Sequence, residues 1–423
     1  MNIKISQAET LLFKGITPYT KKCDIYITND KIAGVDKIPE NFIPDKVIDG
    51  KNRLAIPGLI NTHTHAYMSV FRNIADDLEF NDWLFNRILP LEDKLNPDDI
   101  YWGTLLGALE MIATGTTSYV DMTINMEGSV KAALDSGLRA RVSRGLVGEG
   151  NNEGGAVRIK ENLDYLKYKN DLVSIILGPH APYTCDPEYL KIVTETAKEH
   201  NLPLTIHLSE SEKEIEDIKN LYGCSPIELM EKIGLFDVPT IAAHCVQLSD
   251  NDIEILARKG VIVASNPISN AKLANGFAPL VKMNKAGVNI SIGTDSAASN
   301  NTLNMFSDMN FVSLVHKGKL HDPLAISAED TLKFVYCGGE SAMGEKVGKI
   351  EEGYKADIAL LNTDLPQFYP RNNFVAALCY SANGSEVETV ISNGEILMEN
   401  KEFKTLDKEK IYFECQKTIE RIR

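Results

Sequence analysis

The middle of the chain alternates short apolar runs with longer amphipathic segments. Stretches such as residues 188–199 and 250–259 place apolar residues at helical spacing, with charged residues between them. Eight apolar runs of strand length are expected to be buried parallel strands: residues 58–63, 117–121, 140–145, 173–178, 204–207, 240–244, 261–265 and 288–293. This order predicts an α/β chain whose residues 57–343 form a (β/α)8 barrel of the TIM type.

Both ends of the chain have a different pattern, in which short strand-like runs are separated by turns. These runs are residues 23–28, 31–35, 356–361 and 387–391. Asn393-Gly394 lies between two apolar runs, which is a strong signal for a β-hairpin. We therefore predict a small β-sandwich domain built from both termini. Residues 1–56 form its N-terminal part, and residues 344–423 form its C-terminal part and a C-terminal tail.

The charge of the chain argues against polyanionic partners. Its 423 residues include 44 Lys and Arg against 59 Asp and Glu, which gives a formal net charge of -15. This charge opposes binding to nucleic acid or to anionic membranes. The seven cysteines are scattered without a Cys-x-x-Cys pair, and no apolar run has the length of a membrane span or a signal peptide. We expect a cytoplasmic protein, and the sequence allows a homo-oligomer.

Polar side chains that can bind a metal follow the predicted strands. They are His63, His65, His180, His207, His244 and Asp295. The carboxyl ends of barrel strands surround one mouth, where these side chains would meet. His63-Thr64-His65 alone is weak evidence, because two satisfied or exposed histidines have the same spacing. The whole set favours a metal site, and its nitrogen and oxygen donors suit zinc or ferrous iron better than calcium or magnesium.

Two acidic residues at strand ends have more than one interpretation. Glu210 lies three residues after His207, where it can face the metal site as a proton shuttle, or it can cap the next helix together with Ser209 and Glu212. Asp295 can also be a helix cap. Its position directly after the eighth predicted strand favours a metal ligand.

Five motifs, spread from the first predicted barrel strand to the eighth, resemble the amidohydrolase superfamily. Within it, they resemble the methylthioadenosine/S-adenosylhomocysteine deaminases and their chlorohydrolase-like relatives. The motifs are PGLINTHTH (57–65), GPHAPY (178–183), HLSE (207–210), AHCV (243–246) and GTDSAASNN (293–301). The resemblance implies that His63, His65, His207 and Asp295 bind one catalytic metal and that Glu210 and His244 complete the reaction centre.

The resemblance also indicates the number of metal ions. Relatives with two metals use a carboxylated lysine at the end of the fourth strand, and residues 177–180 contain no lysine. We therefore predict one divalent metal, zinc, with iron as the alternative. The His-x-Glu and Pro-Cys-x-x-Cys signature of the cytidine-type zinc deaminases is absent.

The same resemblance suggests how substrate is bound. It makes Glu92 a ligand of ribose hydroxyls and places Arg144, Arg158 and His180 against the substrate, together with Glu210 and Asp295. Glu92 can also be a plain surface carboxylate, and Arg158 a solvated helix residue. Finally, three apolar residues are candidates for a cavity wall against a thioether tail: Trp83, Phe85 and Leu89.

The implied reaction is hydrolytic deamination of an adenosine-type nucleoside to the inosine analogue and ammonia. The candidate substrates are 5'-methylthioadenosine, S-adenosylhomocysteine and adenosine. In this reaction Asp295 accepts a proton from water, Glu210 protonates the ring nitrogen, and His244 orients the attacking group. The alternatives are a guanine or triazine aminohydrolase or chlorohydrolase that uses the same metal site, and a barrel scaffold without activity.

Overall fold

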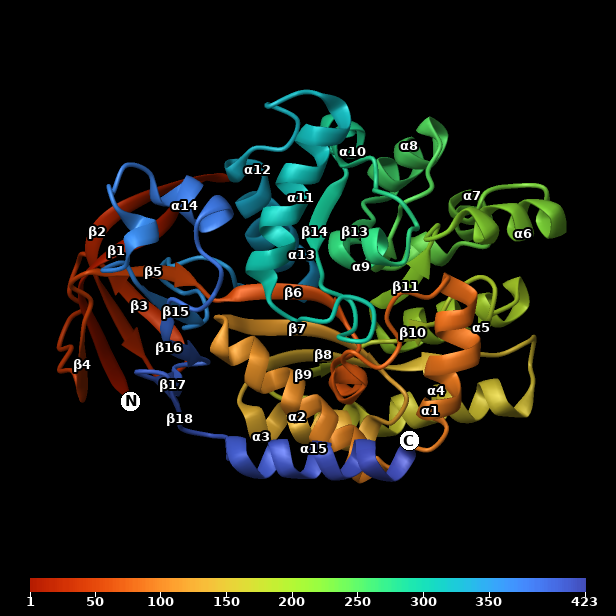
Figure 1. Cartoon of the computed structure of the whole chain (residues 1–423), viewed down its shortest axis with the longest axis horizontal. Helices are drawn as coiled ribbons and strands as arrows, with labels where there is room; N and C mark the ends of the chain where they lie inside the picture. The colour runs from red at the N-terminus through yellow and green to blue at the C-terminus, as the bar shows by residue number, and fades with distance from the viewer.

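Strands from the two ends of the chain pair in one nine-stranded sheet, at the left of the view in Figure 1. The computed structural model describes residues 1–423. The junction is the antiparallel pair of β5 and β15, in which Ala55 lies opposite Leu360. The strands are β1 Asn2–Lys14, β2 Thr17–Thr28, β3 Lys31–Val35, β4 Lys46–Asp49, β5 Arg53–Pro57, β15 Ile358–Asn362, β16 Val387–Ser392, β17 Glu395–Glu399 and β18 Glu402–Phe403. The arrangement of these strands as a two-layered sandwich stays a prediction.

The middle of the chain forms a curled parallel sheet. Its strands are β6 Leu59–Thr64, β7 Thr116–Thr123, β8 Arg139–Leu146, β9 Val173–Ile175, β10 Gly178–Pro179, β11 Leu204–Leu208, β12 Thr240–His244, β13 Ile262–Ser265 and β14 Asn289–Ile292. The fourth predicted strand is divided into β9 and β10, because Ile176 donates to the Val142 carbonyl while Leu177 donates to the Pro203 carbonyl. This change of partner joins β8 to β11.

Hydrogen bonds between the first and the last strand close the barrel. The Asp295 N–H donates to the His63 carbonyl at 2.9 Å, and the Thr62 hydroxyl donates to the Ile292 carbonyl at 2.9 Å. The predicted α/β fold of the TIM-barrel type is thereby confirmed.

Helices surround the barrel (Figure 1). They are α1 Leu89–Glu92, α2 Pro97–Ala113, α3 Met126–Ser136, α4 Glu153–Asp164, α5 Pro187–His200, α6 Glu212–Tyr222, α7 Pro226–Lys232, α8 Asp250–Lys259, α9 Pro267–Lys272, α10 Leu280–Ala286, α11 Met305–Leu320, α12 Ala328–Lys333, α13 Gly339–Met343, α14 Phe374–Tyr380 and α15 Lys408–Ile422. Local capping fixes where they begin: Ser249 and Asp252, for example, form a reciprocal capping box at the start of α8. None of these helices has both the length and the apolar character that crossing a bilayer requires.

Shorter helical turns complete the connections. They are 3-10 turns at Ala66–Phe71, Tyr165–Tyr168, Leu235–Asp237 and Pro366–Phe368, and π-helical turns at Asp82–Ile88 and Phe334–Gly338. The last helix, α15, leaves the sheet and runs along α2 and α3 (Figure 1). There the Thr418 hydroxyl donates to Asp99 at 2.8 Å, and the Cys415 thiol donates to the Trp102 carbonyl at 3.2 Å. The C-terminal tail is therefore part of the barrel's outer layer.

A buried arginine connects the barrel to the terminal sheet. Arg139, at the start of β8, is 1% exposed, and its Nε lies 3.1 Å from Asp357 Oδ2, just before β15. Its Nη2 donates to Asn393 Oδ1 at 3.1 Å, and Glu345 lies 3.3 Å from its Nη1. These contacts compensate a guanidinium charge that has lost its water.

We expect Asp357→Ala to lower the free energy of unfolding by about 3–5 kcal/mol, because it leaves the buried Arg139 charge without its main partner. Asp164→Ala is the control, since Asp164 forms an exposed pair with Lys160 on α4 and should change stability little. Denaturant unfolding of both variants measures the difference. Equal stabilities would show that the Arg139 cluster does not hold the two parts together.

Candidate metal and active site

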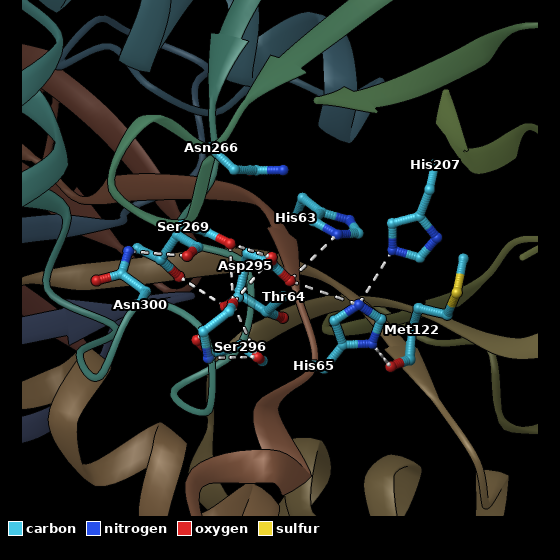
Figure 2. Close-up of polar contacts among 12 residues, drawn as sticks. His63, Thr64, His65, Met122, His207, Asn266, Ser269, Asp295, Ser296 and Asn300 are labelled. Carbon is cyan, nitrogen blue, oxygen red and sulfur yellow. Dashed lines mark hydrogen bonds and ion pairs between the residues drawn. The ribbon is translucent and has the colours of Figure 1, made fainter. Parts of the chain in front are cut away.

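Three imidazoles and a carboxylate converge at the carboxyl ends of the barrel strands (Figure 2). His63 lies near the end of β6 and His65 directly follows this strand. His207 lies near the end of β11, and Asp295 follows β14. His65 Nε2 lies 3.2 Å from His207 Nε2, and Asp295 Oδ1 lies 3.7 Å from His63 Nε2 and 3.6 Å from His65 Nε2. His244, at the end of β12, forms a second close group with His63 and His207. Side chains distant in the chain therefore form one cluster of metal-ligand type.

The protonation pattern of this cluster fits a divalent metal. His65 Nδ1 bonds the Met122 carbonyl at 2.9 Å, and His207 Nδ1 bonds the His180 carbonyl at 2.7 Å. Because carbonyls only accept, both Nδ1 atoms carry hydrogen, so the two Nε2 atoms, which face each other, are the ones that can offer lone pairs to a metal. His63 Nε2 is buried and has no hydrogen-bond partner. A cation at this point would satisfy all three nitrogens.

Burial also favours the neutral, ligating form of the imidazoles. It lowers the pKa of His63 and of His207 well below the ordinary value, and the neighbouring imidazoles lower both further. Metal binding requires neutral histidine, so this environment removes competition from protons at neutral pH.

Two serines fix the carboxylate of Asp295. Asp295 Oδ2 accepts from Ser269 Oγ at 2.6 Å and from Ser299 Oγ at 3.0 Å, which leaves Oδ1 directed toward the imidazoles. Burial alone would raise the pKa of Asp295, but the imidazoles around it and the Ser269 hydroxyl outweigh burial and lower the pKa to about 2. Asp295 is therefore ionised, as a metal ligand must be.

His244 is oriented toward Glu210 by a neighbouring amide. Its Nδ1 bonds Asn270 Oδ1 at 2.8 Å, and its Nε2 lies 3.6 Å from Glu210 Oε2. The backbone of His244 has φ of 73°, a left-handed conformation that a residue other than glycine seldom adopts. The turn after β12 thus aims the ring into the site.

Glu210 is a buried acid at the edge of the cluster. The residue is 5% exposed, and Oε1 accepts from Asn275 Nδ2 at 2.9 Å. Burial, together with the negative charge of Asp295, raises the pKa of Glu210 to about 8. At neutral pH this carboxyl group holds a proton that it can donate.

A cavity of about 660 Å³, which includes solvent at its mouth, opens beside these residues. One wall is apolar and comes from residues 80–89, including Trp83 and Leu89 as predicted. Phe85 does not line the cavity and is 49% exposed. The prediction for Phe85 was wrong because the π-helical turn Asp82–Ile88 directs Trp83 and Ile88 inward and leaves Phe85 in solvent.

Four of the predicted substrate ligands line this cavity: Glu210 and Asp295, described above, and Glu92 and His180. Glu92, at the end of α1, is partly buried and accepts a hydrogen bond from the Tyr67 hydroxyl. Burial raises the pKa of Glu92, although the Tyr67 hydrogen bond opposes this. His180 lies beside His207 and bonds Thr184 Oγ1 through Nδ1 at 2.9 Å, and burial lowers its pKa to about 4. The interpretation of Glu92 as a plain surface carboxylate does not fit this position.

The two predicted arginines lie outside the residues that line the cavity. Arg144 Nε pairs with Glu161 of α4 at 3.1 Å, and Arg144 Nη1 donates to the Gly145 carbonyl at 3.2 Å. Arg158 Nη1 donates to the Val147 and Gly154 carbonyls, each at 3.2 Å. The partners of the two guanidinium groups lie on β8, on α4 and in the loop between them. Their contacts with substrate stay predictions.

Several residues that support the site were missed by sequence reasoning. Asp121 lies near the carboxyl end of β7. Its Oδ1 accepts from Thr64 Oγ1 at 2.9 Å and from the Ala66 N–H at 2.8 Å, so it fixes the chain on both sides of His65. Its position at a strand end was visible in the sequence. Ser269 and Asn270 lie on α9, where nothing in the sequence indicates that they face the metal ligands.

Metal-ligand side chains at the mouth of a (β/α)8 barrel, beside a cavity and a buried acid, define a metal-dependent barrel hydrolase. Residues 54–397 match the amidohydrolase family, and the chain belongs to this family. The family assignment made from the sequence is confirmed.

Relatives are similar over their whole length. A 5-methylthioadenosine/S-adenosylhomocysteine deaminase of Thermoanaerobacter pseudethanolicus is 44% identical over 99% of this chain and 98% of its own. A 5'-deoxyadenosine deaminase of Methanocaldococcus jannaschii is 42% identical over 98% and 100%. Among solved structures, an adenosine deaminase from Xanthomonas campestris with bound zinc has a TM-score of 0.92 at 28% identity, over 100% of this chain and 98% of its own.

We expect His63→Ala to lose most of the bound divalent metal, because it removes a buried nitrogen donor at the centre of the cluster. His180→Gln is the matched control, since it removes an imidazole of the same cavity that is not a predicted ligand. Elemental analysis of the purified proteins gives the metal content per chain. Full metal content in His63→Ala would contradict the ligand assignment.

Proposed function

We propose that this protein catalyses the hydrolytic deamination of an adenosine-type nucleoside to the inosine analogue and ammonia. The observation that carries the proposal is Glu210, a buried carboxyl group that is protonated at neutral pH and lies beside the cluster of metal-ligand side chains. The names of the full-length relatives support the same reaction and suggest 5'-methylthioadenosine, S-adenosylhomocysteine or 5'-deoxyadenosine as substrates.

We propose that one zinc ion is held by His63, His65, His207 and Asp295. Three imidazole nitrogens and one carboxylate oxygen are donors that zinc prefers, and a solved structure of similar fold contains zinc. When bound, the ion would lower the pKa of a water molecule and so supply the nucleophile.

The protein's own groups transfer the protons of the reaction. Asp295, ionised at neutral pH, accepts the proton of the attacking water. Glu210 gives its proton to the ring nitrogen beside the carbon under attack, which draws electrons from that carbon. His244 orients the attacking oxygen through Nε2. Asp295 then gives its proton to the exocyclic amino group, the C–N bond breaks and ammonia leaves. The hydroxyl on the ring carbon loses its proton to Glu210 and becomes the carbonyl, which restores both carboxyl groups to their starting states.

The cavity suggests how a nucleoside is oriented. Tyr67 donates to Glu92 Oε1, which leaves the second carboxylate oxygen of Glu92 for ribose hydroxyls. The apolar wall formed by residues such as Trp83 and Leu89 would face the 5' substituent. We propose that His180 contacts the base or ribose, and that Arg144 and Arg158 reach substrate only after exchanging their present partners.

We also propose the division into residues 1–56, 57–343 and 344–423, with the first and third segments forming one terminal domain. The pairing of β5 with β15 supports this division.

We expect the wild-type protein with zinc to release ammonia from 5'-methylthioadenosine, S-adenosylhomocysteine or adenosine, and not from guanine or triazines. Glu210→Gln should keep its metal and lose most turnover, because glutamine cannot donate the proton. Coupled ammonia detection, with metal measured in the same samples, tests both statements. Activity on guanine or triazines alone would support the alternative hydrolases, and no activity on any compound would support a scaffold.

We expect the loss of kcat/KM at alkaline pH to follow the deprotonation of Glu210. Its raised pKa keeps the reactive, protonated form present at neutral pH, so kcat/KM should be full at lower pH and fall as pH rises through the pKa of about 8. A bound divalent cation stabilises the carboxylate and draws this loss toward lower pH. This is checked by measuring kcat/KM at fixed metal occupancy over a range of about two pH units on each side of the pKa of Glu210. A rate that does not fall on the alkaline side would contradict the donor role.

A further inference from the structure

A second buried carboxylate lies directly behind Glu210. Glu214, in the first turn of α6, is 2% exposed. Its Oε1 accepts from the Ser209 N–H at 2.8 Å, and its Oε2 accepts from the Glu210 N–H at 2.9 Å. Both oxygens of this side chain are therefore engaged by the two residues that connect β11 to the reaction centre.

These bonds are not those of an ordinary helix cap. The cap of α6 is Ser211, whose hydroxyl accepts from the Glu214 N–H at 3.2 Å. In a reciprocal capping box the carboxylate would return to the Ser211 N–H. The Glu214 carboxylate instead reaches past Ser211 to the two preceding N–H groups. The Glu214 carboxylate therefore holds Ser209 and Glu210, which precede the helix, while Ser211 caps the helix itself.

The same two peptide groups are held on their carbonyl side by the chain that follows His244. The Leu208 carbonyl accepts from the Cys245 N–H at 3.0 Å. The Ser209 carbonyl accepts from the N–H groups of Val246 at 2.9 Å and Gln247 at 2.8 Å. Two successive peptide planes are thus fixed at both edges, although Ser209 has the left-handed φ of 51°.

We propose that Glu214 is a positioning residue that fixes the backbone from which Glu210 reaches the substrate. The proposal rests on the proposed function, in which Glu210 transfers a proton. With both peptide planes fixed, the Cα–Cβ direction of Glu210 is set, and Asn275 then holds its carboxyl group at the cavity. Proton transfer is sensitive to small displacements of the donor, so loss of this support should slow turnover while metal binding remains.

The main test compares Glu214→Gln with Glu212→Gln. Glutamine at position 214 can accept one N–H but turns an NH2 group toward the other, so one of the two bonds is lost. We expect kcat to fall about 10- to 100-fold, as for other supporting residues of metal sites, with KM and metal content unchanged. Glu212 is exposed in the same helical turn, so Glu212→Gln removes an equal charge without touching the segment and should behave as wild type.

A double variant separates positioning from general stability. If Glu214 acts through Glu210, Glu214→Gln should cost little further activity in a Glu210→Gln background, because the donor is already absent. A loss as large as in the wild-type background would overturn the proposal. Unchanged kcat in Glu214→Gln, or loss of metal in that variant, would overturn it as well.

Hydrogen exchange provides a readout that needs no substrate. The Ser209 and Glu210 amides are bonded to Glu214, so they should exchange faster in Glu214→Gln than in wild type or in Glu212→Gln. Equal exchange in all three proteins would contradict the positioning role. A wild-type protein that releases no ammonia from any nucleoside, yet shows the faster exchange in Glu214→Gln, would refute the proposed function while leaving the backbone support intact.

Discussion

The arrangement of the active site depends on holding imidazole lone pairs close together out of water. His65 and His207 each carry a proton on Nδ1, because this nitrogen donates to a carbonyl, that of Met122 for His65 and that of His180 for His207. The Nε2 atoms then face each other at 3.2 Å, a repulsive arrangement that a shared cation converts into an attractive one. The ionised Asp295 adds the negative charge that such a cation requires.

The barrel achieves this convergence through its strands and through the turns that follow them. Parallel strands bring their carboxyl ends to one mouth, where His63 and His207 lie on the strands themselves, whereas Asp295 lies in the turn beyond β14. Ser209, His244 and Asp295 all have positive φ, and hydrogen bonds support each of these turns. At Ser209 the buried carboxylate of Glu214 accepts the backbone N–H and so stabilises a strained turn.

This division explains what the sequence could predict. Strand runs and the polar residues that follow them are local patterns, so the eight barrel strands and the convergence of His63, His65, His207 and Asp295 were predictable. Glu214 and Asn275 were not, because their role depends on where their side chains turn after the helix or loop has formed. Phe85 was misplaced for a related reason: a π-helical turn shifts the spacing of inward-facing residues from that of an ordinary helix.

The C-terminal helix α15 contributes to the packing around the apolar wall of the cavity, although the site itself is formed by the barrel. Ile411, Cys415 and Ile422 of α15 belong to the same buried apolar cluster as Trp83 and Ile88, which line the cavity.

Polar contacts reinforce this packing from the same helix. The Lys94 ammonium donates to the Ile422 carbonyl at 2.7 Å, and Arg421 returns a hydrogen bond to the Lys94 carbonyl at 3.2 Å. Lys94 lies two residues after Glu92, so α15 braces the segment that presents this carboxylate. An apolar wall keeps its shape only when it is packed from behind, since an empty space there would let its side chains relax away from the substrate. The C-terminal helix belongs to the packed cluster that contains this wall, together with residues of α2 and of the Ala66–Phe71 turn.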